Sequence, residues 1–408
     1  MPRAARVEAA VATNMIGPLT SNDIRGYSLG ALPLRTAIGV ALLGLCVSLR
    51  AAVLPEDRAD LLFHSYNGGG VTIQGPSLLV RKQFAKNFSS SANYYVDNVS
   101  SASIDVLTTA SPYTEERTQV SLGMDYLHDR WMMSLGLSKS EENDYLAETF
   151  SFGISQDMFG DLTTVSLGYS LGQDEVGRRG DPLFRDTIDR QQYRLGVSQI
   201  LTRNLLLGLS FETISDEGFL NNPYRSVRYV DTCSPLGYSF EPELYPRTRT
   251  SDAGAIRLRY YLPYRAAIHA EYRSYADTWD IAADTFKLGY THPLDNGWLF
   301  EAEIRGYSQT KADFFEDLFP SSQFQNFMAR DKELSTFTSS TLHVGVTYDF
   351  VKNGWRFVER GSVSVFYDHI EFEYEDFRDL TQPTGVAGTE PSYSFGADVL
   401  QFFVSFWF

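Results

Sequence analysis

The last twelve residues of the chain, 397–408, read ADVLQFFVSFWF, and they decide the fold. Counted back from the end, every second residue is large and apolar: Leu400, Phe402, Val404, Phe406 and Phe408. Successive side chains of a β-strand point to opposite faces, so these five share one face. Gln401 and Ser405 lie on the other face, together with Phe403 and Trp407. The chain therefore ends on a strand with one wholly apolar face, which has to meet either a protein core or lipid.

The same two-residue period recurs along the chain after residue 56, where no convincing helix is found. Clear cases are the stretches 87–97, 118–127, 162–172 and 340–350, in which apolar residues alternate with Ser, Gly, Gln, Asn and Asp. Each run has about ten residues or more, the length that a tilted strand needs to cross a bilayer. Alternation of this length predicts strands with lipid on one face and water on the other.

The connections between these runs alternate between short and long. Short ones fall at 85–87, 128–130, 157–161, 201–204, 263–265, 292–297 and 351–356, and long ones at 98–116, 173–187, 216–248, 310–333 and 374–391. Short turns at one end and long loops at the other are typical of an outer-membrane barrel. Aromatic residues beside the short turns predict one interfacial girdle: Phe84, Phe88, Tyr126, Trp131, Phe159, Tyr264, Trp298, Phe350, Trp355 and Phe357.

The number of strands follows from where the chain starts and stops. An exported chain that enters the membrane from the periplasm and ends there needs an even number of strands. A short first strand at 59–66, turned by the glycine-rich stretch 67–70, completes an antiparallel transmembrane β-barrel of sixteen strands, with fourteen as the alternative. Closure is required because an open edge in hydrocarbon leaves backbone groups unpaired. We expect an all-β protein of the bacterial outer membrane, with both termini in the periplasm.

An apolar run at 36–49 follows Arg35 and precedes small residues, which is typical of a secretory signal. We therefore divide the chain into an amino-terminal extension plus signal peptide, residues 1–51, and a single barrel domain, residues 52–408. The domain keeps one cysteine, Cys233, so no internal disulfide is expected.

Charge and motif content exclude several function classes. The formal net charge of -16 argues against nucleic acid as a partner, because phosphate binding needs clustered Lys and Arg. It leaves open a solvated acidic surface or a cation-attracting lumen or rim. The histidines are few and no nucleophile motif accompanies them, so we expect no enzyme and no cofactor. Acidic loop clusters such as 314–320 and 373–380 lack the spacing of a metal motif, and we interpret them as solvated surface.

Two loop stretches, 221–229 and 245–250, are basic in this acidic protein. They either fold inward against carboxylates of the lumen or lie exposed outside.

Charges on neighbouring predicted strands define a candidate site inside the barrel. With turns at 263–265, 277–281 and 292–297, the cross-strand pairs are Arg257–Glu271, Glu271–Lys287 and Lys287–Glu303. Arg259 then lies opposite His269. Opposite charges across a strand pair favour such a register. The predicted ladder, which is either a lumen-filling ion-pair network or an ion filter, comprises Arg257, Arg259, His269, Glu271, Arg273, Lys287, Glu301, Glu303 and Arg305.

Several long stretches resemble a known family. They include HSYNGGGVTIQGPSLLVRK (64–82), ANYYVDNVSSASIDVLTTASPYTEER (92–117), FGISQDMFGDLTTVSLGYS (152–170) and RYYLPYRAAIHAEYR (259–273). On these motifs the chain resembles domain of unknown function 3570 from about Glu56 to Phe408. The resemblance implies an outer-membrane β-barrel of bacteria with two membranes, and it supplies neither an activity nor ligand residues.

Two functions fit these observations. The first is a channel or porin-like transport protein, because sixteen strands enclose an aqueous pore. The alternative is a plugged, non-conducting barrel that anchors a partner protein; the large inward residues Tyr95, Tyr307, Phe403 and Trp407 favour a partly filled lumen. The expected partners are outer-membrane lipids, an unidentified small solute or periplasmic protein, and the barrel assembly machinery. The last of these would read the terminal signal Leu400, Phe402, Val404, Phe406 and Phe408, which resembles that of outer-membrane barrels.

Overall fold

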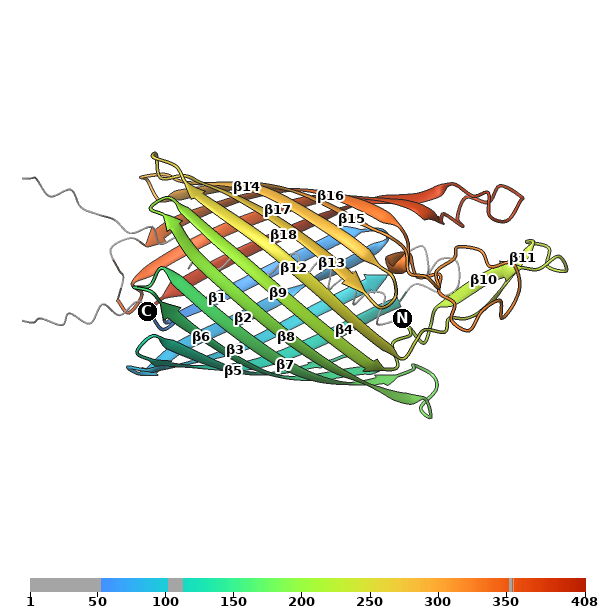
Figure 1. Cartoon of the computed structure of the whole chain (residues 1–408), viewed down its shortest axis with the longest axis horizontal. Helices are drawn as coiled ribbons and strands as arrows, with labels where there is room; N and C mark the ends of the chain where they lie inside the picture. The colour runs from blue at the N-terminus through green and yellow to red at the C-terminus, as the bar shows by residue number, and fades with distance from the viewer. Residues whose placement is uncertain (1–52, 102–112, 352–353, 355) are drawn as a thin grey trace, which may run out of the picture.

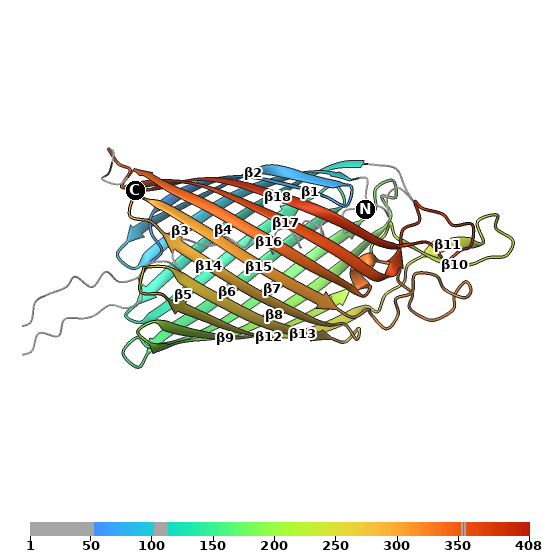
Figure 2. The same cartoon turned by 90° about the horizontal axis from the view of Figure 1, so that it is seen from above.

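The computed structural model describes residues 53–101, 113–351, 354 and 356–408. Sixteen antiparallel strands close into a single tilted barrel (Figures 1 and 2). The predicted barrel and its strand number are thus confirmed, while the extension and signal assigned to residues 1–51 lie outside the described residues. The barrel strands are β1 (Arg58–Gly68), β2 (Val71–Ala85), β3 (Phe88–Ser101), β4 (Tyr113–His128), β5 (Trp131–Glu141), β6 (Tyr145–Met158), β7 (Thr163–Gly177), β8 (Arg185–Thr202), β9 (Leu205–Gly218), β12 (Thr248–Tyr261), β13 (Ala267–Asp277), β14 (Ala282–Pro293), β15 (Trp298–Gln309), β16 (Phe337–Val351), β17 (Arg360–Arg378) and β18 (Ser392–Trp407).

The first and last strands close the barrel. β1 pairs with β18 over its whole length, from Arg58 opposite Trp407 to Gly68 opposite Ala397. Gly68 is needed at this seam, since a Cβ there would lie 2.2 Å from the Cβ of Ala397. The tight turn from β1 to β2 consists of Gly69 and Gly70, both with positive φ, as the glycine run predicted.

The two ends of the barrel differ as the sequence predicted. The turns after β2, β4, β6, β8, β12 and β14 are short and lie at the end where the chain terminates, marked C in Figure 1. The opposite end, here called the long-loop end, carries residues 219–247, 310–336 and 379–391. The first of these loops contains a hairpin of β10 (Ser226–Val230) and β11 (Tyr238–Pro242), and the second contains the 3-10 helix η2 (Lys332–Leu334). The hairpin projects beyond the barrel in both views (Figures 1 and 2).

The outer face of the barrel is apolar, as alternation requires. Leu400, Phe402 and Phe406 on β18 are exposed, and Leu400 keeps 47% of its surface accessible. Trp407 is buried on the opposite face, with the Arg360 guanidinium 4.4 Å from its ring. Phe408 follows β18, and the Lys82 ammonium lies 4.9 Å from its ring.

Aromatic rings cluster on this outer face beside the short turns. Phe88 stacks on Phe84 at 5.7 Å, and its ring centroid lies 4.6 Å from that of Tyr126. Trp131, Phe159, Tyr264, Trp298, Phe350 and Phe357 are also exposed, while Trp355 lies outside the described residues. These positions agree with the predicted interfacial girdle.

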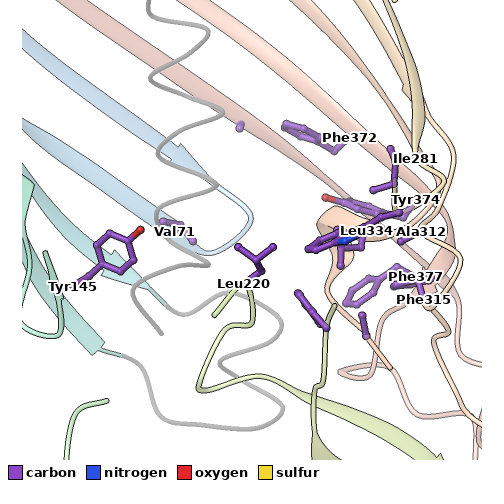
Figure 3. Packing of buried hydrophobic residues seen from close by; sticks show 14 of the residues in the cluster. Val71, Tyr145, Leu220, Ile281, Ala312, Phe315, Leu334, Phe372, Tyr374 and Phe377 are labelled. Atoms are coloured by element: carbon purple, nitrogen blue, oxygen red, sulfur yellow. The ribbon is translucent and has the colours of Figure 1, made fainter. Parts of the chain in front are cut away.

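The largest buried apolar cluster lies at the long-loop end rather than midway along the lumen. Ala312, Phe315 and Leu334 of one long loop gather beside Phe372, Tyr374 and Phe377 of β17 (Figure 3). Val71 and Tyr145 lie apart from them, on the other side of the view. The loop is therefore packed against one side of the barrel wall.

Candidate functional site

A cavity of ≈ 2760 Å³ follows the barrel axis. Arg58, Asp295 and Asp349 line it near the short turns, and Tyr245 and Leu334 line it at the long-loop end. All nine residues of the predicted ladder belong to its lining. The lumen is therefore the candidate functional site.

One side of the lumen, called here the charged wall, is formed by the inward faces of β12 to β15. Arg257 is directly opposite Glu271 and forms an ion pair with it, and Glu271 is opposite Lys287. Arg259 is opposite His269. These three cross-strand pairs have the register that the sequence predicted.

The predicted pair Lys287–Glu303 is wrong by two residues. Lys287 lies opposite Arg305, and Glu303 lies opposite Gly289. The reason is the turn: β14 runs on to Pro293, so only four residues, 294–297, connect it to β15, and Gly297 adopts a φ of 91°. A shift of two residues keeps each side chain on the same face, so the inward assignment is unaffected.

Gly289 gives the carboxylate of Glu303 a different partner. The His269 ring reaches across β14, and its Nε2 lies 2.8 Å from Oε2 of Glu303. A Cβ on Gly289 would lie 2.1 Å from that ring. The glycine is thus the gap through which two strands that are not neighbours are bridged.

Two further acidic groups, one on this wall and one on β17 beside it, have histidine neighbours. Nδ1 of His343 on β16 lies 2.6 Å from Oδ1 of Asp368 on β17. Glu301 faces the lumen nearer to the short turns, within electrostatic range of His269 and His343.

Three cations of the charged wall have weaker partners. Arg273 is 3.8 Å from Glu212, close to the limit for an ion pair. Arg305 lies 5.3 Å from the centroid of the Tyr307 ring, and its buried Nη1 has no hydrogen-bond acceptor among the described residues. Lys287 forms no ion pair or hydrogen bond with the described part of the chain. The ladder is therefore only partly neutralised.

The other side of the lumen, called the neutral wall, is formed by the inward faces of β4 to β7. Midway along these strands the inward residues are Ser and Gly: Ser121, Gly123, Ser134, Gly136, Ser151, Gly153, Ser166 and Gly168. A Cβ on Gly136 would lie 2.5 Å from Oγ of Ser151. Of this wall, Gln119, Ser121, Thr164 and Ser166 line the cavity, which thus has one charged side and one side with neutral polar groups.

Long loops meet in a compact assembly, called here the loop cap, made of residues 219–247, 310–336 and 379–391. At its centre Arg228 is completely buried. Its guanidinium binds Asp317, and Nη1 donates to Oε1 of Glu390 at 2.8 Å. Arg330 forms a second ion pair with Asp317 at 3.0 Å. One buried charge network therefore joins all three loops.

No pattern in the sequence predicted this buried charge network. The interpretation of the acidic stretch 314–320 as solvated surface is wrong for Asp317, because only 8% of the surface of this residue is exposed. The basic stretch 221–229 does fold against carboxylates, but Arg225 and Arg228 meet acids of the other loops: Asp317, Asp331 and Glu390. The available signal was the basic character of that loop in an acidic chain.

A second buried acid lies beside the network. Oε1 of Glu243 accepts a hydrogen bond from the Arg330 amide at 2.8 Å, and Oε2 accepts one from the Tyr245 hydroxyl at 2.6 Å. Burial, and next the charge of Asp331, raise the pKa of Glu243 to about 7, against the opposing effect of Arg225. This acid therefore titrates close to neutrality.

The described residues contain no helix that could cross a membrane and no group of three or more His, Cys, Asp or Glu placed to hold a metal ion. Cys233 is exposed in the hairpin between β10 and β11.

The closed antiparallel barrel with an apolar outer face defines an outer-membrane type of protein. The chain belongs to the family described as "Protein of unknown function (DUF3570)", whose profile matches residues 90–194 and 184–362. No curated protein matches the sequence.

Solved structures with a similar fold are outer-membrane barrels. One is described as a bacterial polysaccharide outer membrane secretin, with TM-score 0.47, 9% identity, and coverage of 87% of this chain and 99% of that one. Another is OccD3 (OpdP) of Pseudomonas aeruginosa, with TM-score 0.43, 10% identity, and coverage of 86% and 91%. A third is OmpT of Vibrio cholerae in its trimer form, with TM-score 0.42, 10% identity, and coverage of 86% and 98%. At these identities the similarity concerns the fold alone.

Proposed function

We propose that the chain forms a channel for small solutes in the bacterial outer membrane, with both termini in the periplasm. The observation that carries the proposal is the cavity of ≈ 2760 Å³, which extends from the short turns to the loop cap and is lined by charged and polar side chains together with aromatic residues such as Phe403 and Trp407. A lumen that served only as packing would be filled by large side chains. The neutral wall instead carries Ser and Gly, which leave the space open to water.

The test is conductance of the purified mature chain in planar bilayers. We expect defined single-channel steps. A barrel that is folded, as shown by heat-modifiable mobility in gels, and that remains silent at all voltages would contradict the channel.

A second candidate is a non-conducting barrel that serves as anchor or scaffold for a partner protein. The loop cap favours it, since a buried ion network holds three loops together over one end of the barrel. Deletion of residues 310–336 separates the candidates. A channel that conducts with and without this loop supports the first, whereas conductance found only after deletion supports the second.

We also propose that the barrel catalyses no reaction, and that its outer face meets lipid. The terminal strand would be read by the assembly machinery, because its alternate residues Leu400, Phe402 and Phe406 are exposed on that face. Removing Phe408 should lower the amount of folded barrel in the membrane. The matched variant Phe403→Leu, which changes an inward residue, should not.

A further inference from the structure

We propose that Lys287, Arg305 and Arg273 form an anion-binding subsite in the lumen for a solute that carries carboxylate or phosphate groups. The inference rests on the proposed channel function and names the class of solute that the channel would take.

The first observation is a like-charge pair across two strands. Lys287 and Arg305 are direct neighbours on β14 and β15, and both face the cavity. Like charges directly opposite each other destabilise a strand pair. Their presence side by side therefore calls for a negative group between them.

The chain supplies this pair only with carboxylates that are shared with other groups. Glu271, directly opposite Lys287, forms its ion pair with Arg257. Glu303, which interacts electrostatically with both cations, is bound to His269. Neither Lys287 nor Arg305 forms an ion pair with a carboxylate of the described residues.

The second observation concerns the donors of Arg305. Its Nη1 is buried and has no acceptor in the described part of the chain. A buried donor without a partner costs about 1–3 kcal/mol. An oxyanion would satisfy it, since the planar guanidinium matches two oxygens of a carboxylate or phosphate at once. The Lys287 ammonium would add a point charge, and Tyr307, 5.3 Å from Arg305, supports the guanidinium from one side.

Arg273 completes the subsite from the neighbouring strand. It is opposite Thr285 on β14, one inward position away from Lys287. The carboxylate with which it forms an ion pair, that of Glu212, is 3.8 Å distant. Across the cavity the neutral wall presents no competing charge midway along its strands, so the three cations set the local sign of the lumen although the whole chain carries a net charge of -16.

Binding is tested on the full barrel in detergent by titration calorimetry with inorganic phosphate and, separately, with citrate. We expect saturable binding of at least one anion, and a loss of tenfold or more in affinity in the double variant K287Q/R305Q. The matched control is R185Q, which removes one exposed charge at the start of β8, outside the cavity lining, and should bind as the wild type does. The anion that binds more tightly distinguishes a phosphorylated from a carboxylate solute. No binding of either anion to the wild type, or equal binding to the double variant, overturns the subsite.

Ion selectivity separates this inference from the channel itself. In a KCl gradient across a planar bilayer, K287Q/R305Q should shift the reversal potential toward cation selectivity, and R185Q should not. A silent barrel that still binds anions, with binding lost in K287Q/R305Q, overturns the channel and keeps the subsite. A conducting barrel whose selectivity is the same in wild type and K287Q/R305Q overturns the subsite and keeps the channel.

Discussion

The barrel wall and the loop cap are held together by different forces. In the wall, each strand is hydrogen-bonded along its length to the next strand, and only the β1–β18 seam joins distant parts of the chain. In the cap, the central contact between Arg228 and Glu390 joins residues 162 positions apart through side-chain charges. The wall therefore depends mainly on backbone pairing, so a single side chain affects it less than one affects the cap. The cap depends on a few buried charges, so it is the part that responds to mutation and to pH.

The largest effect is expected when the central cation of the cap, Arg228, is removed. In Arg228→Leu the carboxylate of Glu390 remains buried without its partner and Asp317 keeps only Arg330, so we expect the cap to be destabilised by about 3–5 kcal/mol. Limited proteolysis should then cut residues 310–336, while heat-modifiable mobility shows an intact barrel.

A matched variant controls for the loss of packing. R228L/E390Q removes Glu390 together with the cation, while Asp317 keeps its ion pair with Arg330. It should recover much of the protease resistance, because no unpaired carboxylate is left buried. A cap that stays resistant in Arg228→Leu alone would show that the network contributes little.

The pH response of the cap is the next largest effect. The pKa of Glu243 is raised from 4.5 to about 7, so between these values the folded cap holds a proton that the unfolded chain has released. The contribution of Glu243 to stability is therefore fully present below about pH 4.5 and is lost as the pH rises toward 7, at about 1.4 kcal/mol per pKa unit.

Hydrogen exchange of residues 310–336, corrected for the intrinsic rate, measures this response. We expect faster opening at pH 8 than at pH 5, and a flat profile in Glu243→Gln. Exchange in β5 to β7 should not change with pH in either protein. Equal pH dependence in the variant would assign the response to another group.

A smaller effect tests a side-chain contact within the wall. Gly289→Ala should displace the His269 ring and remove its hydrogen bond to Glu303, which lowers the free energy of unfolding by about 1.5–3 kcal/mol. Urea unfolding in detergent measures the loss. Gly306→Ala is the matched control, since a Cβ there meets nothing within 4 Å. If both variants unfold alike, the gap over Gly289 has no special role.

The smallest effect is expected at the short turns. Arg265 and Asp295 form an ion pair between two turns, and both side chains are largely exposed. Arg265→Ala should change the free energy of unfolding by about 0–1 kcal/mol, and added salt should abolish the difference. A loss of about 3–5 kcal/mol would mean that an exposed ion pair contributes as much to this barrel as the buried network does to the cap.

The sequence predicted the wall well because the facing of a strand depends only on local alternation. It assigned the ladder residues to the lumen, and the register between β12 and β13 followed from one short turn. The Lys287–Glu303 pair failed because two further residues of β14 stay paired, and no local pattern marks where a strand ends in a turn. The cap was not predictable in the same way. Arg228, Asp317 and Glu390 belong to three loops without a period, and nothing in the spacing of the loops relates these residues.

The seam between β1 and β18 sets a condition on biogenesis. Arg58 finds its partner Trp407 only when almost the whole polypeptide has been synthesised and translocated. Until then two strand edges carry unpaired amide and carbonyl groups, which can pair with any neighbouring chain. Contacts so distant in sequence also form slowly. This topology therefore leaves the incomplete sheet open to pairing with other chains until the last strand is in place, and a chain that lacks that strand would leave the cylinder open.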